Sequence, residues 1–155
     1  MAKASPSQIL TALEACMTSI VFDAADLVSE VDRFTPVRIA SEIEAVERDR
    51  VFAVVLLAGP YAVGNRSRCR DEIRAEVAVR YFFAEASRAR MVEDAPRVRR
   101  ALRAISTVQI GTPLATVPGD PDAVVEGPYY DYQTMADVSA VLMRCIVTVA
   151  YEAEA

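Results

Sequence analysis

Apolar residues near the N-terminus recur at intervals of three and four positions, at Ile9, Leu13, Cys16 and Ile20. This spacing places them on one face and predicts a helix over roughly residues 6–22. The sequence also marks its start, because Ser5 can cap the helix, Pro6 suits the first turn and Gln8 completes a capping box. The apolar stripe is wide, so we expect this helix to pack on a sheet.

The middle of the chain has the signature of two strands. VFAVVLLA, residues 51–58, is short and apolar on both faces, which is typical of a central strand covered on both sides. We expect Gly59-Pro60 to end it. DEIRAEVAVRYFFAE, residues 71–85, alternates instead, so that one face meets a core and the other meets solvent or a partner. The predicted core face contains Ile73, Ala75, Val77, Val79, Tyr81 and Phe83.

The remaining segments before residue 110 are less regular. The loop over residues 61–70 contains Gly64-Asn65 as a turn signal, and two strands joined by a loop of about a dozen residues most simply pair as a long hairpin. Between residues 23 and 50, Pro36 can begin a short strand through residue 40, and Ser41 to Glu44 resembles a second capping box for a helix through Glu47.

EDAPRVRRALRAIS, residues 93–106, predicts a second helix. Asp94 can cap it, and Pro96 is tolerated in a first turn. The apolar stripe consists of Ala95, Val98, Leu102 and Ile105. The opposite side carries Arg97, Arg99, Arg100 and Arg103.

The C-terminal part divides into a loop and a strand. Residues 111–128 are rich in proline and glycine and predict a surface loop. Residues 129–155 predict one long closing strand, whose core face would contain Val141, Met143, Cys145, Val147, Val149 and Tyr151. The order of elements favours the α+β class: a mainly antiparallel sheet with helices packed on one face, a two-layer sandwich in a single domain over residues 1–155.

Composition narrows the chemistry. The chain has no histidine, which removes Ser-His-Asp and Cys-His catalysis and the commonest metal ligand. Cys16, Cys69 and Cys145 lie far apart in the sequence, which indicates reduced cysteines in a core or in incidental positions. No apolar run approaches the ~20 residues that span a bilayer and no secretory signal opens the chain, so the cytoplasm is the expected location. The net charge of −5 disfavours generic attraction to nucleic acid or an anionic membrane.

One acidic group is a candidate metal site, formed by Asp120, Asp122 and Glu126. Carboxylates at this spacing could hold Ca²⁺, but the twelve-residue EF-hand pattern is absent, and solvated acidic residues are the favoured interpretation. No catalytic constellation is visible either. We therefore expect no enzyme activity, no cofactor and no metal.

Three clusters are candidates for contacts with other proteins. The first is the arginine side of the second helix, with Arg97, Arg100 and Arg103. The second is the loop over residues 60–71, with Arg66, Arg68 and Arg70. The third is the tyrosine cluster, Tyr129, Tyr130 and Tyr132. The arginines could dock on acidic surfaces or be solvated, and the tyrosines could fill a core edge or an interface.

With these segments in order, the chain resembles the tail-terminator proteins of long-tailed bacteriophages of the lambda type. The likeness rests on the N-terminal SQILTALEA helix, the VFAVVLLAGPY and DEIRAEVAVRYFFAE strands with the EDAPRVRRALRAI helix, and the ending YYDYQTMADVSAVLMRCIVTVAYEAE. These segments make up about half of the chain. Residues 23–50 and 111–128 are longer than the pattern would require.

The resemblance implies a structural role in the virion neck. Tail terminators form a homo-hexameric ring on the last ring of the tail tube, stop its polymerisation and present a surface to the head connector or stopper protein. It implies assembly in the host cytoplasm, DNA that passes through the ring without specific binding, and no membrane contact. We expect Arg97, Arg100 and Arg103 to serve subunit or tube contacts, and loops 60–71 and 111–128 to face the tube or the connector.

Three alternatives remain open at this point, of which a cytoplasmic regulatory or toxin-type protein is the least favoured. Another neck component, such as a head-completion or stopper protein, would also be small, α+β and ring-forming. A small cytoplasmic enzyme or ligand-binding domain would instead have a deep apolar pocket with convergent polar groups.

Overall fold

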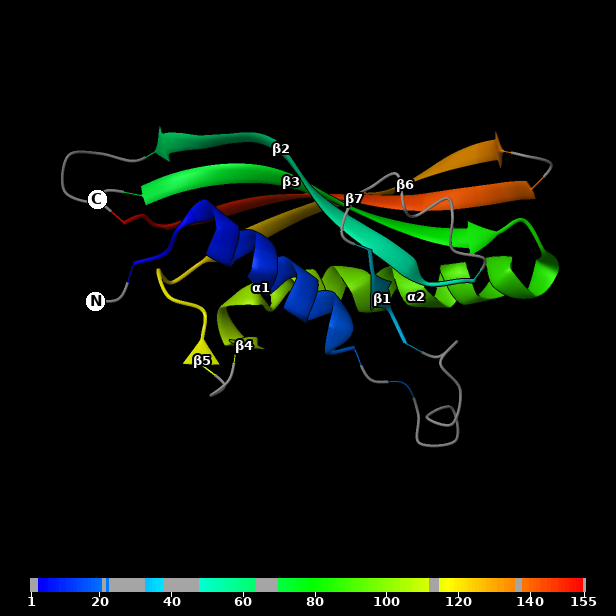
Figure 1. Cartoon of the computed structure of the whole chain (residues 1–155), viewed down its shortest axis with the longest axis horizontal. Helices are drawn as coiled ribbons and strands as arrows, with labels where there is room; N and C mark the ends of the chain where they lie inside the picture. The colour runs from blue at the N-terminus through cyan, green and yellow to red at the C-terminus, as the bar shows by residue number, and fades with distance from the viewer. Residues whose placement is uncertain are drawn as a thin grey trace.

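The computed structural model describes residues 3–20, 22, 33–37, 48–63, 70–111, 115–135 and 138–154. Within these residues the chain forms a long twisted sheet of five strands, and two helices lie against one face of it (Figure 1). The predicted α+β class and its two-layer arrangement are confirmed. No helix in the described part of the chain is both long and apolar enough to cross a membrane.

The five strands lie in the order β1 (Thr35–Pro36), β2 (Val51–Val63), β3 (Arg70–Phe82), β7 (Val138–Glu152) and β6 (Asp122–Met135). β1 pairs with β2 in parallel, and every other pair is antiparallel, including the predicted β2–β3 hairpin. Two short strands, β4 (Gln109–Ile110) and β5 (Ala115–Thr116), form a separate small sheet after a 3-10 turn at Ile105–Thr107.

The core lies between the sheet and the helices. β3 and β7 pair along the whole length of β3, and their alternate side chains face the helices. Those side chains are fully buried, as predicted: Ile73, Ala75, Val77, Val79, Tyr81, Val141, Met143, Cys145, Val147, Val149 and Tyr151. Burial raises the pKa of Cys16 to about 12 and that of Cys145 to about 11, so both are inert core thiols. Cys69 lies outside the described residues.

The first helix, α1 (Pro6–Thr18), starts as predicted and ends four residues earlier than the predicted residue 22. Ser5 and Gln8 form the capping box, in which the Gln8 backbone N–H donates to Ser5 Oγ. Its buried face consists of Ile9, Ala12, Leu13, Cys16 and Met17.

The second helix, α2 (Glu85–Arg103), begins eight residues before the predicted start. Asp94 therefore does not cap it, and Pro96 lies inside it. The reason is that residues 85–93 are mostly good helix formers and continue the buried stripe backwards through Met91. Phe83, predicted to face the core, is exposed because β3 has already ended at Phe82.

The prediction that β2 is a central strand covered on both sides holds only at its start, where Val51, Phe52 and Ala53 are buried on both faces. Within the described residues β1 pairs only with Val51 and Phe52, so the rest of β2 lies at the edge of the sheet, where Leu56 and Leu57 are exposed. Gly59-Pro60 does not end the strand either. The ladder to β3 skips these two residues and resumes at Tyr61, as an edge strand permits.

The predicted closing strand is in fact two strands. Residues 122–128, predicted as loop, belong to β6, which pairs with β7 from Asp122 opposite Ala150 to Met135 opposite Val138. A proline-containing bulge hid this strand from the pattern, since the ladder skips Gly127 and Pro128 just as β2 skips its own Gly-Pro pair. Both edge strands thus share the sequence Gly-Pro-Tyr at a bulge, and both glycines have a positive φ.

The segment over residues 23–50 is only partly described. β1 covers Thr35–Pro36, beside the strand predicted from Pro36, and residues 38–40 lie outside the described residues. The short helix predicted through Glu47 also lies outside them.

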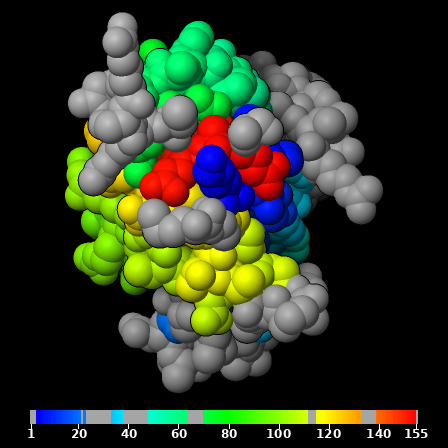
Figure 2. All heavy atoms as spheres, turned by 90° about the vertical axis from the view of Figure 1, so that its left-hand side faces the viewer, coloured from blue at the N-terminus to red at the C-terminus, as the bar shows by residue number. Residues whose placement is uncertain are grey.

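The two ends of the chain meet at one end of the sheet. Ala4 forms a parallel bridge with Ala153, and its N–H donates to the Glu152 carbonyl at 2.9 Å. Figure 2 shows this end, with N-terminal atoms lying against the end of β7. The N-terminal residues thus extend the sheet surface at this end.

Replacing Gly59 with alanine should lower the free energy of unfolding by about 1–3 kcal/mol, because its φ of +98° suits glycine. The added Cβ would also lie 2.6 Å from the Glu72 carbonyl oxygen. Urea denaturation measures the change. Ala62→Ser on the same exposed edge is the control and should shift the free energy by less than about 0.5 kcal/mol. An unchanged midpoint for Gly59→Ala would contradict the described bulge.

Candidate interaction surface

A buried ion pair fixes α2 on the sheet. Arg50, in the turn before β2, donates from Nε to Asp94 Oδ2 at 2.8 Å and from Nη2 to Oδ1 at 3.0 Å. Tyr81 on β3 donates its hydroxyl to the same Oδ2 at 2.6 Å. All three residues are buried, and the Arg50 guanidinium also lies 4.1 Å from the centre of the Phe22 ring. The Asp94 carboxylate in the middle of α2 is thereby bound both by the turn before β2 and by β3.

A second carboxylate holds the beginning of α2. Asp49 accepts hydrogen bonds from the Phe82 N–H at 2.8 Å, from Ser87 Oγ at 2.7 Å and from Arg90 Nη1 at 2.8 Å. The turn over residues 49–50 therefore contacts α2 at two places along its length. This attachment determines which side of the helix faces β6.

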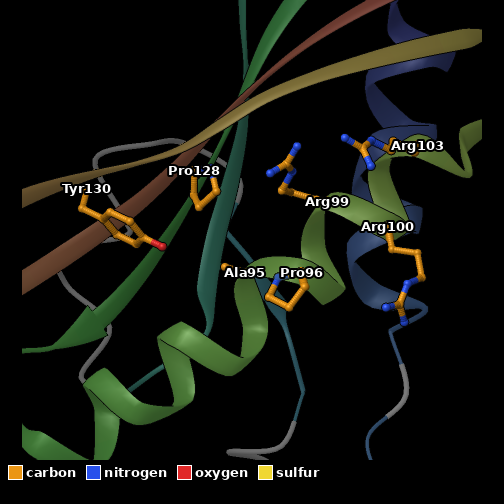
Figure 3. A pocket seen from close by; sticks show the side chains of 7 residues that line it. All are labelled: Ala95, Pro96, Arg99, Arg100, Arg103, Pro128 and Tyr130. Atoms are coloured by element: carbon orange, nitrogen blue, oxygen red, sulfur yellow. The ribbon is translucent and has the colours of Figure 1, made fainter.

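The side of α2 that faces β6 forms an open groove of about 520 Å³. We call it the arginine groove; its lining residues are Ala95, Pro96, Arg99, Arg100, Arg103, Pro128 and Tyr130. Figure 3 shows Arg99 and Arg103 pointing toward β6, the Tyr130 hydroxyl pointing into the groove, and Arg100 pointing away from the strand. The groove has a mixed surface, with aliphatic and ring carbon at its floor and cationic groups along one wall.

The cations of the groove are not neutralised by the rest of the described chain. Within the described residues, Arg99, Arg100 and Arg103 form no hydrogen bond or ion pair, and Arg99 Nε is buried without a hydrogen-bond partner. Partial burial raises the pKa of the Tyr130 hydroxyl, which is therefore protonated at neutral pH and able to donate. The groove is suited to carboxylate groups, which guanidinium binds in a bidentate manner.

The structure brings together part of two predicted clusters. Arg100 and Arg103 line the groove with Tyr130. Arg97 does not belong to it, because its Nη1 lies 3.3 Å from Asp94 Oδ1 and its guanidinium 5.1 Å from the Phe22 ring centre. Arg97 serves mainly the attachment of α2, and lines a smaller hollow between α1 and α2.

The three tyrosines are exposed but do not act as one cluster. Tyr129 is opposite Arg144 in the ladder and lies on the sheet face away from the helices, whereas Tyr130 and Tyr132 lie on the helix side. The Tyr132 ring packs edge-on against Phe83 at 5.8 Å. None of the three tyrosines is buried at the edge of the core, so their exposure favours the interface interpretation.

The loop arginines are only partly described. Arg66 and Arg68 lie outside the described residues. Arg70 donates from Nη2 to the carbonyls of Asp120 and Ala150, at 2.9 and 3.0 Å, so it ties the start of β3 to β7 and the turn before β6.

The acidic group does not form a metal site. No cluster of three or more potential ligands that could hold a metal ion occurs in the described part of the chain. Glu126 instead lies 3.8 Å from Arg74, across the sheet face away from the helices. On the same face Arg144 bridges Glu76 and Asp131.

Sequence patterns did not identify Arg50 or Asp49, and they assigned Asp94 to a cap. They placed Tyr81 on the core face without its hydrogen bond to Asp94. One signal was available, because Asp94 lies on the same helical stripe as Met91 and Val98, three and four residues away. An acidic residue on a buried stripe requires a partner. Nothing in the sequence indicates that this partner is Arg50.

No protein-family model matches this chain, and no curated protein matches it.

Replacing Asp94 with alanine should lower the free energy of unfolding by about 3–5 kcal/mol, since removing one partner of a buried ion pair leaves the other charge without its counterion. Chemical denaturation followed by far-UV circular dichroism measures this. Glu93→Ala, at the exposed neighbouring position, is the matched control and should change stability by less than about 0.5 kcal/mol. Equal losses for the two variants would contradict the role assigned to the ion pair.

Stability should also fall at high pH. Burial, and next the Asp94 carboxylate, raise the pKa of Tyr81 above its ordinary value of 10.0. The unfolded chain therefore loses this proton first, so the stabilisation is complete below pH 10 and is lost as pH rises above it. Unfolding free energies between pH 8 and 11.5 should decline more steeply for the native chain than for Tyr81→Phe, by up to about 1.4 kcal/mol per pH unit. Parallel profiles would contradict this.

Proposed function

We propose that this protein is a ring-forming structural protein of a bacteriophage neck, a tail terminator that caps the tail tube, stops its polymerisation and joins the tail to the head connector. The observation that carries the proposal is that one sheet presents chemically different exposed surfaces on its two outer long strands, in the part of the chain that the structure describes. β2 exposes Leu56, Leu57 and Tyr61, and β6 exposes Val124 and its tyrosines. Closed rings require such heterologous contacts, in which one patch meets a different patch on the neighbour.

The step from a ring-forming protein to a tail terminator rests on the sequence resemblance. A homo-hexamer, and contacts with tail-tube protein on one side and the connector or stopper on the other, follow from that likeness alone. The net charge of −5 per chain agrees with a channel that lets DNA pass without holding it. Residues 122–128 belong to β6, so within the predicted loop 111–128 the contacts with these partners would come from residues 111–121.

Native mass spectrometry and a tube-growth assay test the proposal. The purified chain should appear as a hexamer, alone or after mixing with tail-tube protein, and should stop the elongation of growing tubes at substoichiometric amounts. The same assay with Asp94→Ala, expected to be less stable, shows how far capping depends on the fold. A strict monomer in both samples together with unchanged tube growth would rule the function out. Binding to the portal side alone would favour a stopper protein.

A further inference from the structure

The sheet face away from the helices carries more acid than base. Six carboxylates and four arginines lie on it, as their positions in the ladders with β7 show: Glu72, Glu76, Asp122, Glu126, Asp131 and Glu152, with Arg70, Arg74, Arg80 and Arg144. Arg144 bridges two of them and Arg74 lies near a third. Glu72 and Asp122, which flank Ala150 from either side, form no ion pair within the described residues. We call this surface the acidic face.

The acidic face also carries exposed apolar and aromatic side chains. Tyr61 lies opposite Glu72 in the ladder, Val124 opposite Thr148 and Tyr129 opposite Arg144. All three are more than half exposed, at 57%, 61% and 53%. Exposed aromatic and apolar side chains among charges are typical of protein contact surfaces.

The arginine groove and the acidic face cannot meet within one molecule. The groove lies between α2 and β6 on the helix side of the sheet, whereas Glu72 and Asp122 alternate with helix-facing residues and point to the other side. Within the described residues, the three arginines without ion-pair partners on one face and the carboxylates without ion-pair partners on the other are complementary in charge. A contact between two copies satisfies both.

We propose that the arginine groove of one copy docks on the acidic face of the next, so that α2 of each subunit covers the exposed part of this face on its neighbour. The contact is heterologous, and it specifies how the proposed ring is closed; it therefore rests on the proposed function. Arg100 and Arg103 approach Glu72 and Asp122 of the neighbour, and Tyr130 donates a hydrogen bond at the same contact.

Complementary charge reversal tests this contact. The groove variant is Arg100→Glu with Arg103→Glu, and the face variant is Glu72→Arg with Asp122→Arg. Arg99 stays in place because its Nε is buried. Each variant alone places like charges together, which costs several kcal/mol, so the apparent dissociation constant should rise at least about tenfold. An equimolar mixture should assemble again, in alternating order, because every groove then meets a face of opposite charge.

Native mass spectrometry of heavy-isotope-labelled groove variant with unlabelled face variant reads out the alternation. Arg88→Glu reverses one charge, where the groove variant reverses two, on an exposed part of α2 outside the groove, and should assemble as the native chain does. Circular dichroism melting of each variant confirms that it is folded. The native assembly should weaken as salt rises, since exposed charges are screened.

Two outcomes would overturn the inference. If both variants form the native ring unaided, the ring closes through other surfaces, and the proposed function still stands. If the groove variant fails to assemble and the face variant does not rescue it, the groove binds something other than the acidic face. A native chain that stays monomeric with tail-tube protein would remove both the inference and the function on which it rests.

Discussion

The structure depends on one buried charge pair, between Arg50 and Asp94. Four parts of the chain meet there: the turn before β2, β3 through Tyr81, the middle of α2, and Phe22 beyond α1. A carboxylate in an apolar environment is tolerated only where its partners are in reach. We infer that the pair specifies the position of α2, because a helix displaced by one residue would remove Asp94 from both donors.

That position determines what the surface can do. Because Asp94 faces the sheet, Arg99 and Arg103 near the C-terminal end of α2 point toward β6, and Arg100 lies at the rim of the groove. The chemistry of the groove is therefore set by a contact more than a helical turn away. The two-layer fold contributes the other surface, since both described helices lie on one side of the sheet and Val124 and Tyr129 are exposed on the other.

Local patterns predicted what depends on local physics. The capping box at Ser5, the alternation through β3 and β7, and the fold class all follow from spacing and turn chemistry. The misassignments lie where tertiary contacts decide. Asp94 resembles a cap in sequence, yet a residue 44 positions away accounts for it. The Gly-Pro pairs of β2 and β6 indicate the end of a strand, yet each strand continues because a bulge at the sheet edge accommodates the pair. The groove joins Arg103 to Tyr130, which no spacing rule relates.

The Gly-Pro-Tyr bulges on the two outermost long strands affect how the protein aggregates at high concentration. Proline offers no N–H, and the skipped residues interrupt the row of backbone groups that a foreign strand would need. Neighbouring molecules can therefore contact these edges through side chains, but the bulges oppose the continuous backbone hydrogen bonding that fibrils require. At high concentration this interruption opposes strand addition at these two edges, so contacts made there between copies remain reversible.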